Sequence, residues 1–223
     1  TLGNFALWLS LLFAVSQFLI SQKNNKLKSK FIIISVNGLL ICSLISFFSL
    51  MYVHIVSDFS VLNVFQNSHT TKPLLYKVSG VWGNHEGSML LWILVLTIFN
   101  YFIFKLYNKK NCLFISKTLE TQAFITIGFI LFTALTSNPF EKMIPAQENG
   151  LGFNPILQDP ALAIHPPLLY IGYVGFSAAF SISIATLSLS DNEKVPWHSY
   201  MKPFVLAAWT FLSIGIALGS VWA

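Results

Sequence analysis

Two segments of the chain contain the residues whose types and spacing could do chemistry. The first is segment 81–92, V-W-G-N-H-E-G-S-M-L-L-W, in which two glycines bracket Asn, His and Glu. Glycine lets a ligand or another backbone approach closely, so Trp82, His85 and Glu86 are candidate binding residues. The alternative is structural: Ser88 caps a helix, Glu86 sits at its positive end and the tryptophans form an interfacial belt.

The second segment is 154–170, N-P-I-L-Q-D-P-A-L-A-I-H-P-P-L-L-Y. Pro166 and Pro167 suit the first turn of a helix, which predicts His165 at the helix N-cap. An imidazole presented rigidly at such a position is a candidate metal ligand. The alternative is a helix start built from Asx and proline residues, without a ligand.

Other types of site find little support in the sequence. The two segments contain no zinc-type spacing, no nucleophile–base–acid set and no phosphate loop. Tryptophan faces with an imidazole at their edge suit a flat, apolar, metal-containing ligand such as haem. We expect His54 to be a snorkelling residue at a membrane interface, the alternative being a third group beside the two segments. Cys42 and Cys112 belong to no Cys/His cluster and are expected to be unpaired thiols.

The elements that must position these segments are membrane-spanning helices. Hydrophobic residues make up 55% of the chain and charged residues 9%, with a mean hydropathy of +0.68, whereas a soluble domain has about 25% charged residues. A span needs roughly 20 apolar residues. The sequence therefore predicts an all-α, polytopic membrane protein, one bundle over residues 1–223, with the fourth and least hydrophobic helix inside. The six expected spans are Leu2–Ile20, Phe31–Val56, Ser88–Leu106, Leu119–Thr136, Pro167–Leu189 and Pro203–Trp222.

The loop lysines predict the orientation of this bundle. Ten lysines follow the first, third and fifth spans, and three follow the second and fourth. Because cytoplasmic loops are richer in Lys and Arg, both termini and both candidate segments are expected on the outer side. All 13 basic residues are lysine. The lack of arginine disfavours nucleic-acid binding and indicates an AT-rich genome, such as an organellar one.

A set of motifs identifies a resemblance. They are L-G-N-F-A-L at 2–7, W-G-N-H-E-G-S-M-L-L-W at 82–92, T-S-N-P-F at 136–140, Q-D-P at 158–160, H-P-P-L-L-Y-I-G-Y-V-G-F-S at 165–177 and L-G-S-V-W-A at 218–223. In this order they resemble, over essentially the whole chain, the N-terminal part of the CcmF family. Members of that family are haem lyase subunits of the system I cytochrome c maturation pathway, and some mitochondrial genomes split the protein into separate chains.

The resemblance implies a function and partners. CcmF-type proteins receive haem from the chaperone CcmE and join its vinyl groups to the two thiols of a CxxCH motif in apocytochrome c. By its His-Pro-Pro context, His165 matches the first of two outer histidines that hold the transferred haem, so it is the candidate axial ligand of the iron. Trp82, His85 and Glu86 are expected to line or shape the outer vestibule in which this haem is held. Further implied partners are a CcmH-type protein and membrane lipid, in a mitochondrial inner membrane or a bacterial cytoplasmic membrane.

The sequence ends at residue 223, immediately before the Trp-rich WWD segment of the family would begin. The resemblance implies that a C-terminal partner chain supplies this segment, the second outer histidine and the ligands of an integral haem b. The chain is therefore expected to be one part of a lyase assembly and not a complete enzyme. The alternative is an accessory subunit of a larger inner-membrane complex, such as a respiratory one. Transport is disfavoured because charged residues are scarce within the spans.

Overall fold

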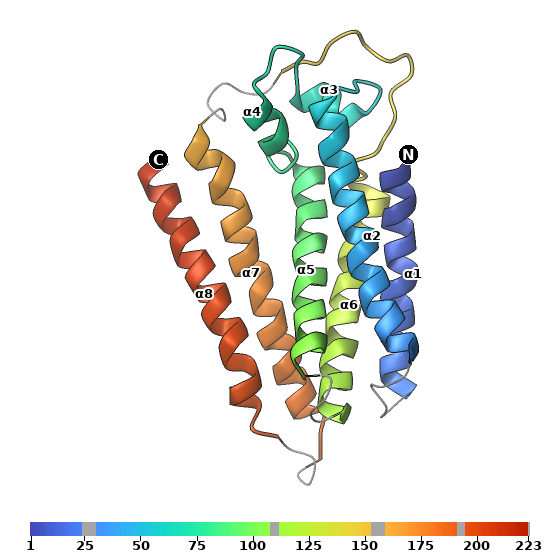
Figure 1. Ribbon diagram of the computed structural model, residues 1–223, viewed down its shortest axis with the longest axis vertical. Coiled ribbons are helices and arrows are strands. Elements are labelled where there is room, and N and C mark those ends of the chain that lie inside the picture. Colours follow the sequence, from blue (N-terminus) through green and yellow to red (C-terminus); the bar gives the residue numbers. More distant parts are fainter. Residues whose placement is uncertain (24–29, 108–111, 153–158, 191–194, 223) are drawn as a thin grey trace.

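The chain forms an all-helical bundle with a cap at one end, as the computed structural model shows for residues 1–23, 30–107, 112–152, 159–190 and 195–222 (Figure 1). The regular elements in these ranges are helices, and the only bridge between extended residues there pairs Val61 with Lys142. The helices are α1 (Leu2–Lys23), α2 (Lys30–Ile55), α3 (Leu62–Asn67), α4 (Leu74–Ser79), α5 (His85–Tyr107), α6 (Cys112–Thr136), α7 (Pro160–Leu187) and α8 (Trp197–Trp222).

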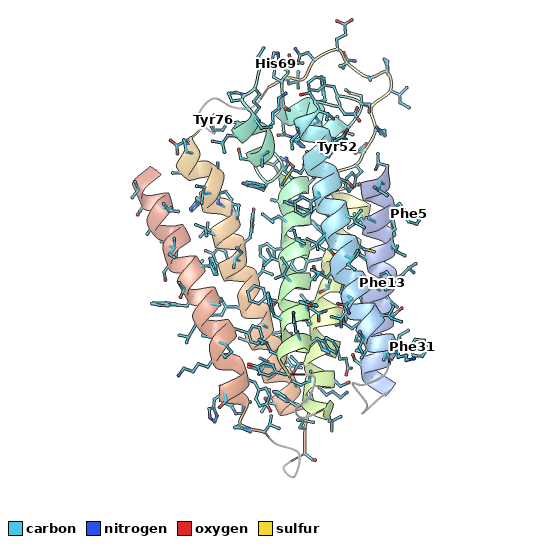
Figure 2. The ribbon with its side chains drawn as sticks, viewed as in Figure 1. Phe5, Phe13, Phe31, Tyr52, His69 and Tyr76 are labelled. Carbon is cyan, nitrogen blue, oxygen red and sulfur yellow. The ribbon has the colours of Figure 1, made fainter. Side chains whose placement is uncertain are left out.

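The six long helices match the six expected spans. Each is long and apolar enough to cross a membrane, which confirms the prediction of a polytopic helical membrane protein. α5 packs against α2, α6 and α7, and α8 packs against α7 at the edge of the bundle. α5 is accordingly the most buried span and α8 the least. Phe5 and Phe31 point outward from α1 and α2 (Figure 2) and are 66% and 70% exposed, as suits lipid-facing side chains.

Buried polar side chains form hydrogen bonds between the spans in the interior of the bundle. Gln17 on α1 and Asn100 on α5 exchange two hydrogen bonds of 2.8 Å, and Gln17 also donates to the Leu119 carbonyl on α6 (3.0 Å). Gln122 on α6 bonds to two serines of α7. Among the polar residues that make the fourth span the least hydrophobic, Gln122 thus bonds to a neighbouring helix, whereas Thr121 and Thr126 donate to carbonyls of α6 itself. α6 is as buried as α2 and α7, so the innermost span is α5 and not α6 as predicted.

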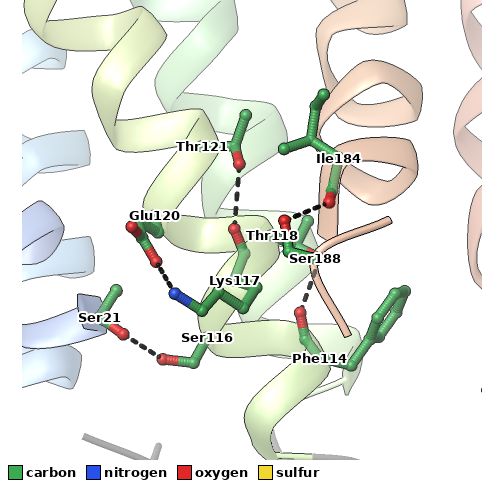
Figure 3. Close-up of polar contacts among 9 residues, drawn as sticks. All are labelled: Ser21, Phe114, Ser116, Lys117, Thr118, Glu120, Thr121, Ile184 and Ser188. Atoms are coloured by element: carbon green, nitrogen blue, oxygen red, sulfur yellow. Dashed lines mark hydrogen bonds and ion pairs between the residues drawn. The ribbon is translucent and has the colours of Figure 1, made fainter. Parts of the chain in front are cut away.

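α6 begins earlier than the expected Leu119, and its extra turns make polar contacts at the end of the bundle opposite the cap. Ser116 donates to the Ser21 carbonyl at the end of α1 (2.9 Å), and Lys117 pairs with Glu120 at 2.8 Å (Figure 3). The ion pair joins residues three positions apart on one helix, so it stabilises the first turns of α6 in addition to the contact with α1.

Both long loops lie at one end of the bundle, together with both chain ends (Figure 1). The chain ends thus share a side, as an even number of spans requires. The first loop contains the short helices α3 and α4, which the sequence analysis did not predict. The second loop wraps around α3 through backbone hydrogen bonds, from Leu62 N–H to Glu141 (2.9 Å) and from Leu151 N–H to Phe65 (2.8 Å). We call these two joined loops, residues 57–84 and 137–152, the cap.

Candidate functional site

His165 lies in the second turn of α7, near the capped end of the bundle. The predicted N-cap position is wrong, because α7 begins at Pro160 and not at Pro167. The Asp159 carboxylate accepts a hydrogen bond from the Ala161 backbone N–H (2.7 Å), which is the usual bond of an N-cap side chain. Pro166 therefore lies inside the helix, and the His165 ring projects from the side of the helix and not from its N-terminus.

The His165 ring is oriented by α8. Its Nδ1 lies 2.7 Å from the Gly215 carbonyl oxygen. A carbonyl can only accept, so Nδ1 carries a hydrogen, and in the neutral ring the lone pair is then on Nε2. The side chain is half-buried, and no hydrogen bond to Nε2 is found within the described part of the chain. This is how metal-binding histidines are prepared, with one nitrogen held by an outer partner and the other free for the metal.

Trp82 connects the first candidate segment to the start of α7. Its Nε1–H donates to the Ala163 carbonyl at 2.9 Å, two residues before His165. Its ring stacks on Phe47 of α2, with centroids 6.5 Å apart and planes at 12°. Trp82 therefore fixes the first turns of α7 against α2 and the cap.

His85 and Glu86 face other neighbours than His165 does. His85 Nε2 lies 3.0 Å from the Ser137 hydroxyl, and its ring meets Phe132 of α6 edge-on. The Glu86 carboxylate accepts a hydrogen bond from Asn63 of α3 (3.2 Å). His85 thus packs on the α6 side of α5, whereas His165 packs on α8.

The loop before α5 turns directly into the helix. α5 begins at His85, and Asn84 caps it by accepting a bond from the Gly87 N–H (2.8 Å). The predicted Ser88 cap is wrong, because the Ser88 hydroxyl donates to the His85 carbonyl instead (2.8 Å). A side chain at Gly87 would collide with the Val81 carbonyl, so the expected close approach of backbone to glycine is found here.

A buried polar network that the sequence analysis missed holds the cap on the bundle. His54 is fully buried, so the predicted snorkelling position is wrong. Its Nε2 lies 2.9 Å from Asn63 Oδ1, and Asn63 Nδ2 donates to Asn84 Oδ1 (2.7 Å) and to Glu86. Because the Asn63 amide donates to two acceptors, its oxygen must accept from His54 Nε2–H. The only feature of the sequence that pointed to this network was a histidine, His54, at the end of an apolar span.

Tryptophan also lines the interior below the cap. Trp92 of α5 stacks on Phe129 of α6 at 5.3 Å and meets Tyr170 of α7 edge-on at 5.7 Å. Aromatic contacts of this geometry add about 0.5–1.5 kcal/mol each beyond their buried area. They hold α5, α6 and α7 together one to two turns below the residues that face the cap.

Comparison with known proteins identifies related chains. The family model described as cytochrome C assembly protein matches residues 82–223. The cytochrome c-type biogenesis protein CycK of Rhizobium meliloti is 45% identical over all of this chain, and CcmF of Haemophilus influenzae is 42% identical over all of it. A solved structure of the cytochrome c heme lyase CcmF superposes with a TM-score of 0.84 and 25% identity over 99% of this chain.

These relatives are longer than the chain. It spans 33% of the CycK protein, 35% of the Haemophilus influenzae CcmF and 35% of the solved CcmF chain. The family match begins at Trp82 and includes His85, Glu86 and His165. The candidate site residues all lie inside the matched region.

Proposed function

The chain belongs to the cytochrome c assembly protein family, and on that premise we propose that it forms the N-terminal part of a CcmF-type cytochrome c haem lyase. The substrates are haem and the CxxCH thiols of apocytochrome c. The chain spans about a third of the length of its relatives, and we propose that the complete activity also needs the part that corresponds to the rest of their length. In the complete lyase this chain contributes one wall of the haem site.

The observation on which the proposal rests is the orientation of His165. His165 Nδ1–H donates to the Gly215 carbonyl oxygen (2.7 Å), and Nε2 has no hydrogen-bond partner in the described part of the chain, on a half-buried ring near the capped end. A neutral imidazole in this tautomer fits the axial position of haem iron. We assign His165 as one axial ligand of the transferred haem.

The reaction is the addition of a thiol across a vinyl group. The sulfur bonds to the vinyl carbon next to the porphyrin ring, and the thiol hydrogen ends on the terminal carbon. Atoms balance without an added oxidant or reductant. The task of this chain is positioning, because His165 fixes the plane and height of the haem while the cysteines approach. A fixed geometry of this type turns a bimolecular step into an effectively unimolecular one.

We propose supporting roles for the other candidate residues. Trp82 holds the first turns of α7 through its bond to the Ala163 carbonyl (2.9 Å). Glu86 anchors α3 through Asn63, and His85 anchors the second loop of the cap through Ser137. These contacts favour shaping the vestibule over direct contact with the haem.

The partners follow from the same proposal. CcmE delivers the haem, a CcmH-type protein and apocytochrome c meet the cap, and a C-terminal CcmF-like chain supplies the WWD segment, the second axial histidine and the integral haem b. The membrane is a mitochondrial inner membrane or a bacterial cytoplasmic membrane. The cap faces outward, since the lysine-poor loops form it.

The test is His165→Ala in the organism that uses this protein, with covalent c-type haem measured by peroxidase staining. His198→Ala is the control, because His198 is an exposed residue of the first turn of α8, and α8 begins at the end of the bundle opposite the cap (Figure 1). We expect c-type cytochromes to be lost in the first variant and retained in the second. Normal cytochrome levels in His165→Ala, with the variant present in membranes, would refute the ligand assignment.

The alternative of an accessory subunit in a larger complex predicts a different purification. The lyase proposal expects the tagged chain to co-purify with a WWD-bearing partner and with haem b. Stoichiometric recovery with respiratory subunits and without haem would favour the accessory role.

A further inference from the structure

We propose that Gly215 and Gly219 of α8 are positioning residues that hold the His165 ring in its iron-binding orientation. The inference rests on the proposed function, because it concerns how the axial ligand is prepared. It assigns α8 a part in the site, although α8 contributes no ligand itself.

Gly215 supplies the hydrogen-bond acceptor and also the space to reach it. Its carbonyl oxygen is 2.7 Å from His165 Nδ1. A Cβ at this position would lie 2.8 Å from Leu169 Cδ2, and Leu169 follows His165 by one helical turn. Because residue 215 has no side chain, α7 comes close enough for the His165 imidazole to reach the Gly215 carbonyl. That carbonyl then accepts one bond within α8 and one from the imidazole. A carbonyl has two lone pairs, so both bonds are possible.

Gly219 provides the surface against which the ring lies. A Cβ at this position would lie 2.6 Å from His165 Cε1 and 3.1 Å from Nδ1. These distances are well inside van der Waals contact, so any side chain here must displace the ring. The two glycines are one turn apart on the same face of α8. Together they fix the ring's hydrogen bond and its lateral position.

Two other glycines of the same helix pair provide an internal comparison. Cβ atoms at Gly172 and Gly175 of α7 would lie 2.6 Å from Leu212 Cβ and 2.9 Å from Ala208 Cβ. A Cβ at Gly172 would also lie 2.8 Å from the Leu212 backbone N and Cα, whereas the nearest atoms at Gly175 are side-chain carbons, including Phe99 Cζ at 2.8 Å. Both glycines explain close helix packing, which small residues permit in membranes. Gly215 and Gly219 differ because the group they accommodate is an imidazole with a defined proton.

Substitution of these glycines is expected to change the orientation of the His165 ring and not the fold of the bundle. Outer partners of metal-binding histidines fix the tautomer and ring orientation, and their loss typically costs about 10- to 100-fold in metal affinity or activity. Displacement of the ring by Gly219→Ala should therefore weaken haem binding by about that factor. Gly175→Ala creates a similarly close contact on α7, 2.8 Å from Phe99 Cζ and 2.9 Å from Ala208 Cβ, without touching His165, so it should change haem binding little.

The experiment compares Gly219→Ala, Gly175→Ala and His165→Ala in the assembled membrane complex. Haem affinity is measured by titration with haem, the axial ligand by its resonance Raman iron–histidine band, and accumulation by immunoblot. Added imidazole is the decisive probe, because it can replace a displaced ligand but cannot repair a misfolded bundle. We expect Gly219→Ala to lose affinity and the native band, and imidazole to restore binding.

Several results would overturn the inference. They are unchanged affinity in Gly219→Ala, an equal loss in Gly175→Ala, or a loss in Gly219→Ala that imidazole does not reduce. If Gly219→Ala fails to accumulate, Gly215→Ala replaces it, because its Cβ meets the flexible end of Leu169 and lengthens the Nδ1–carbonyl contact. Unchanged affinity in His165→Ala refutes the proposed function instead. A loss in His165→Ala with normal behaviour of Gly219→Ala refutes only the positioning role.

Discussion

Replacement of Asn63 by leucine should release the cap from the bundle. Asn63 is 4% exposed and accepts from His54 Nε2, so Asn63→Leu leaves a fully buried ring N–H without its acceptor. An orphaned donor costs about 1–3 kcal/mol, and each lost net hydrogen bond about 1 kcal/mol. With the bonds to Asn84 and Glu86 also lost, we expect the free energy of unfolding to fall by about 3 kcal/mol.

The assay is equilibrium unfolding of the purified assembly in mixed micelles, as a double-mutant cycle with His54→Leu. When both polar partners are removed, no orphan remains, so the double variant should be more stable than the sum of the single losses implies. Gln66→Leu is the control, since Gln66 is exposed on the same short helix and should stay within about 0.5 kcal/mol of the parent. Strict additivity, or an Asn63→Leu loss no larger than that of Gln66→Leu, would refute the reasoning.

Three further predictions use other contacts. The variants Gln17→Leu and Asn100→Leu should each destabilise the bundle by about 1–2 kcal/mol and show coupling in a double-mutant cycle, since the two amides satisfy each other; additive losses would contradict this. Trp82→Phe retains the stacked ring but loses the bond to Ala163, so amide exchange in the first turns of α7 should accelerate while α5 stays protected. Burial lowers the pKa of Lys72 to about 8, below its unfolded value, so stability should rise as pH increases from about 8 to 10; Lys72→Met should remove that part of the rise in unfolding titrations.

The spans were predictable because each is a long apolar run, and a bilayer demands about the same length from every helix. Their starts were less predictable. Pro166 and Pro167 were interpreted as a first turn, although Asp159 and Pro160 are the better N-cap and N1 pair. Two proline signals six residues apart, at Pro160 and Pro166, cannot be ranked without knowing what packs against each of them.

The candidate residues were recognisable by type, but their contacts were not. Trp82 reaches Ala163 across 81 positions of sequence, and His165 reaches Gly215 across 50. Such pairs depend on how α7 lies between α5 and α8, which no local pattern specifies. Asn63 belongs to no motif at all and lies in a helix of six residues, too short for a periodic signal.

The contacts of the cap and of α8 converge on the same turns of α7. On the cap side, Asn63 bonds to Asn84, the N-cap residue of α5. The neighbouring Trp82 in turn bonds to the Ala163 carbonyl of α7. From the other side, the Gly215 carbonyl holds His165 itself. Trp82→Phe should therefore move the backbone that carries His165, the proposed ligand, whereas Gly219→Ala should move only its ring. If both variants weaken haem binding but imidazole rescues only Gly219→Ala, the two contacts set different parts of the ligand geometry.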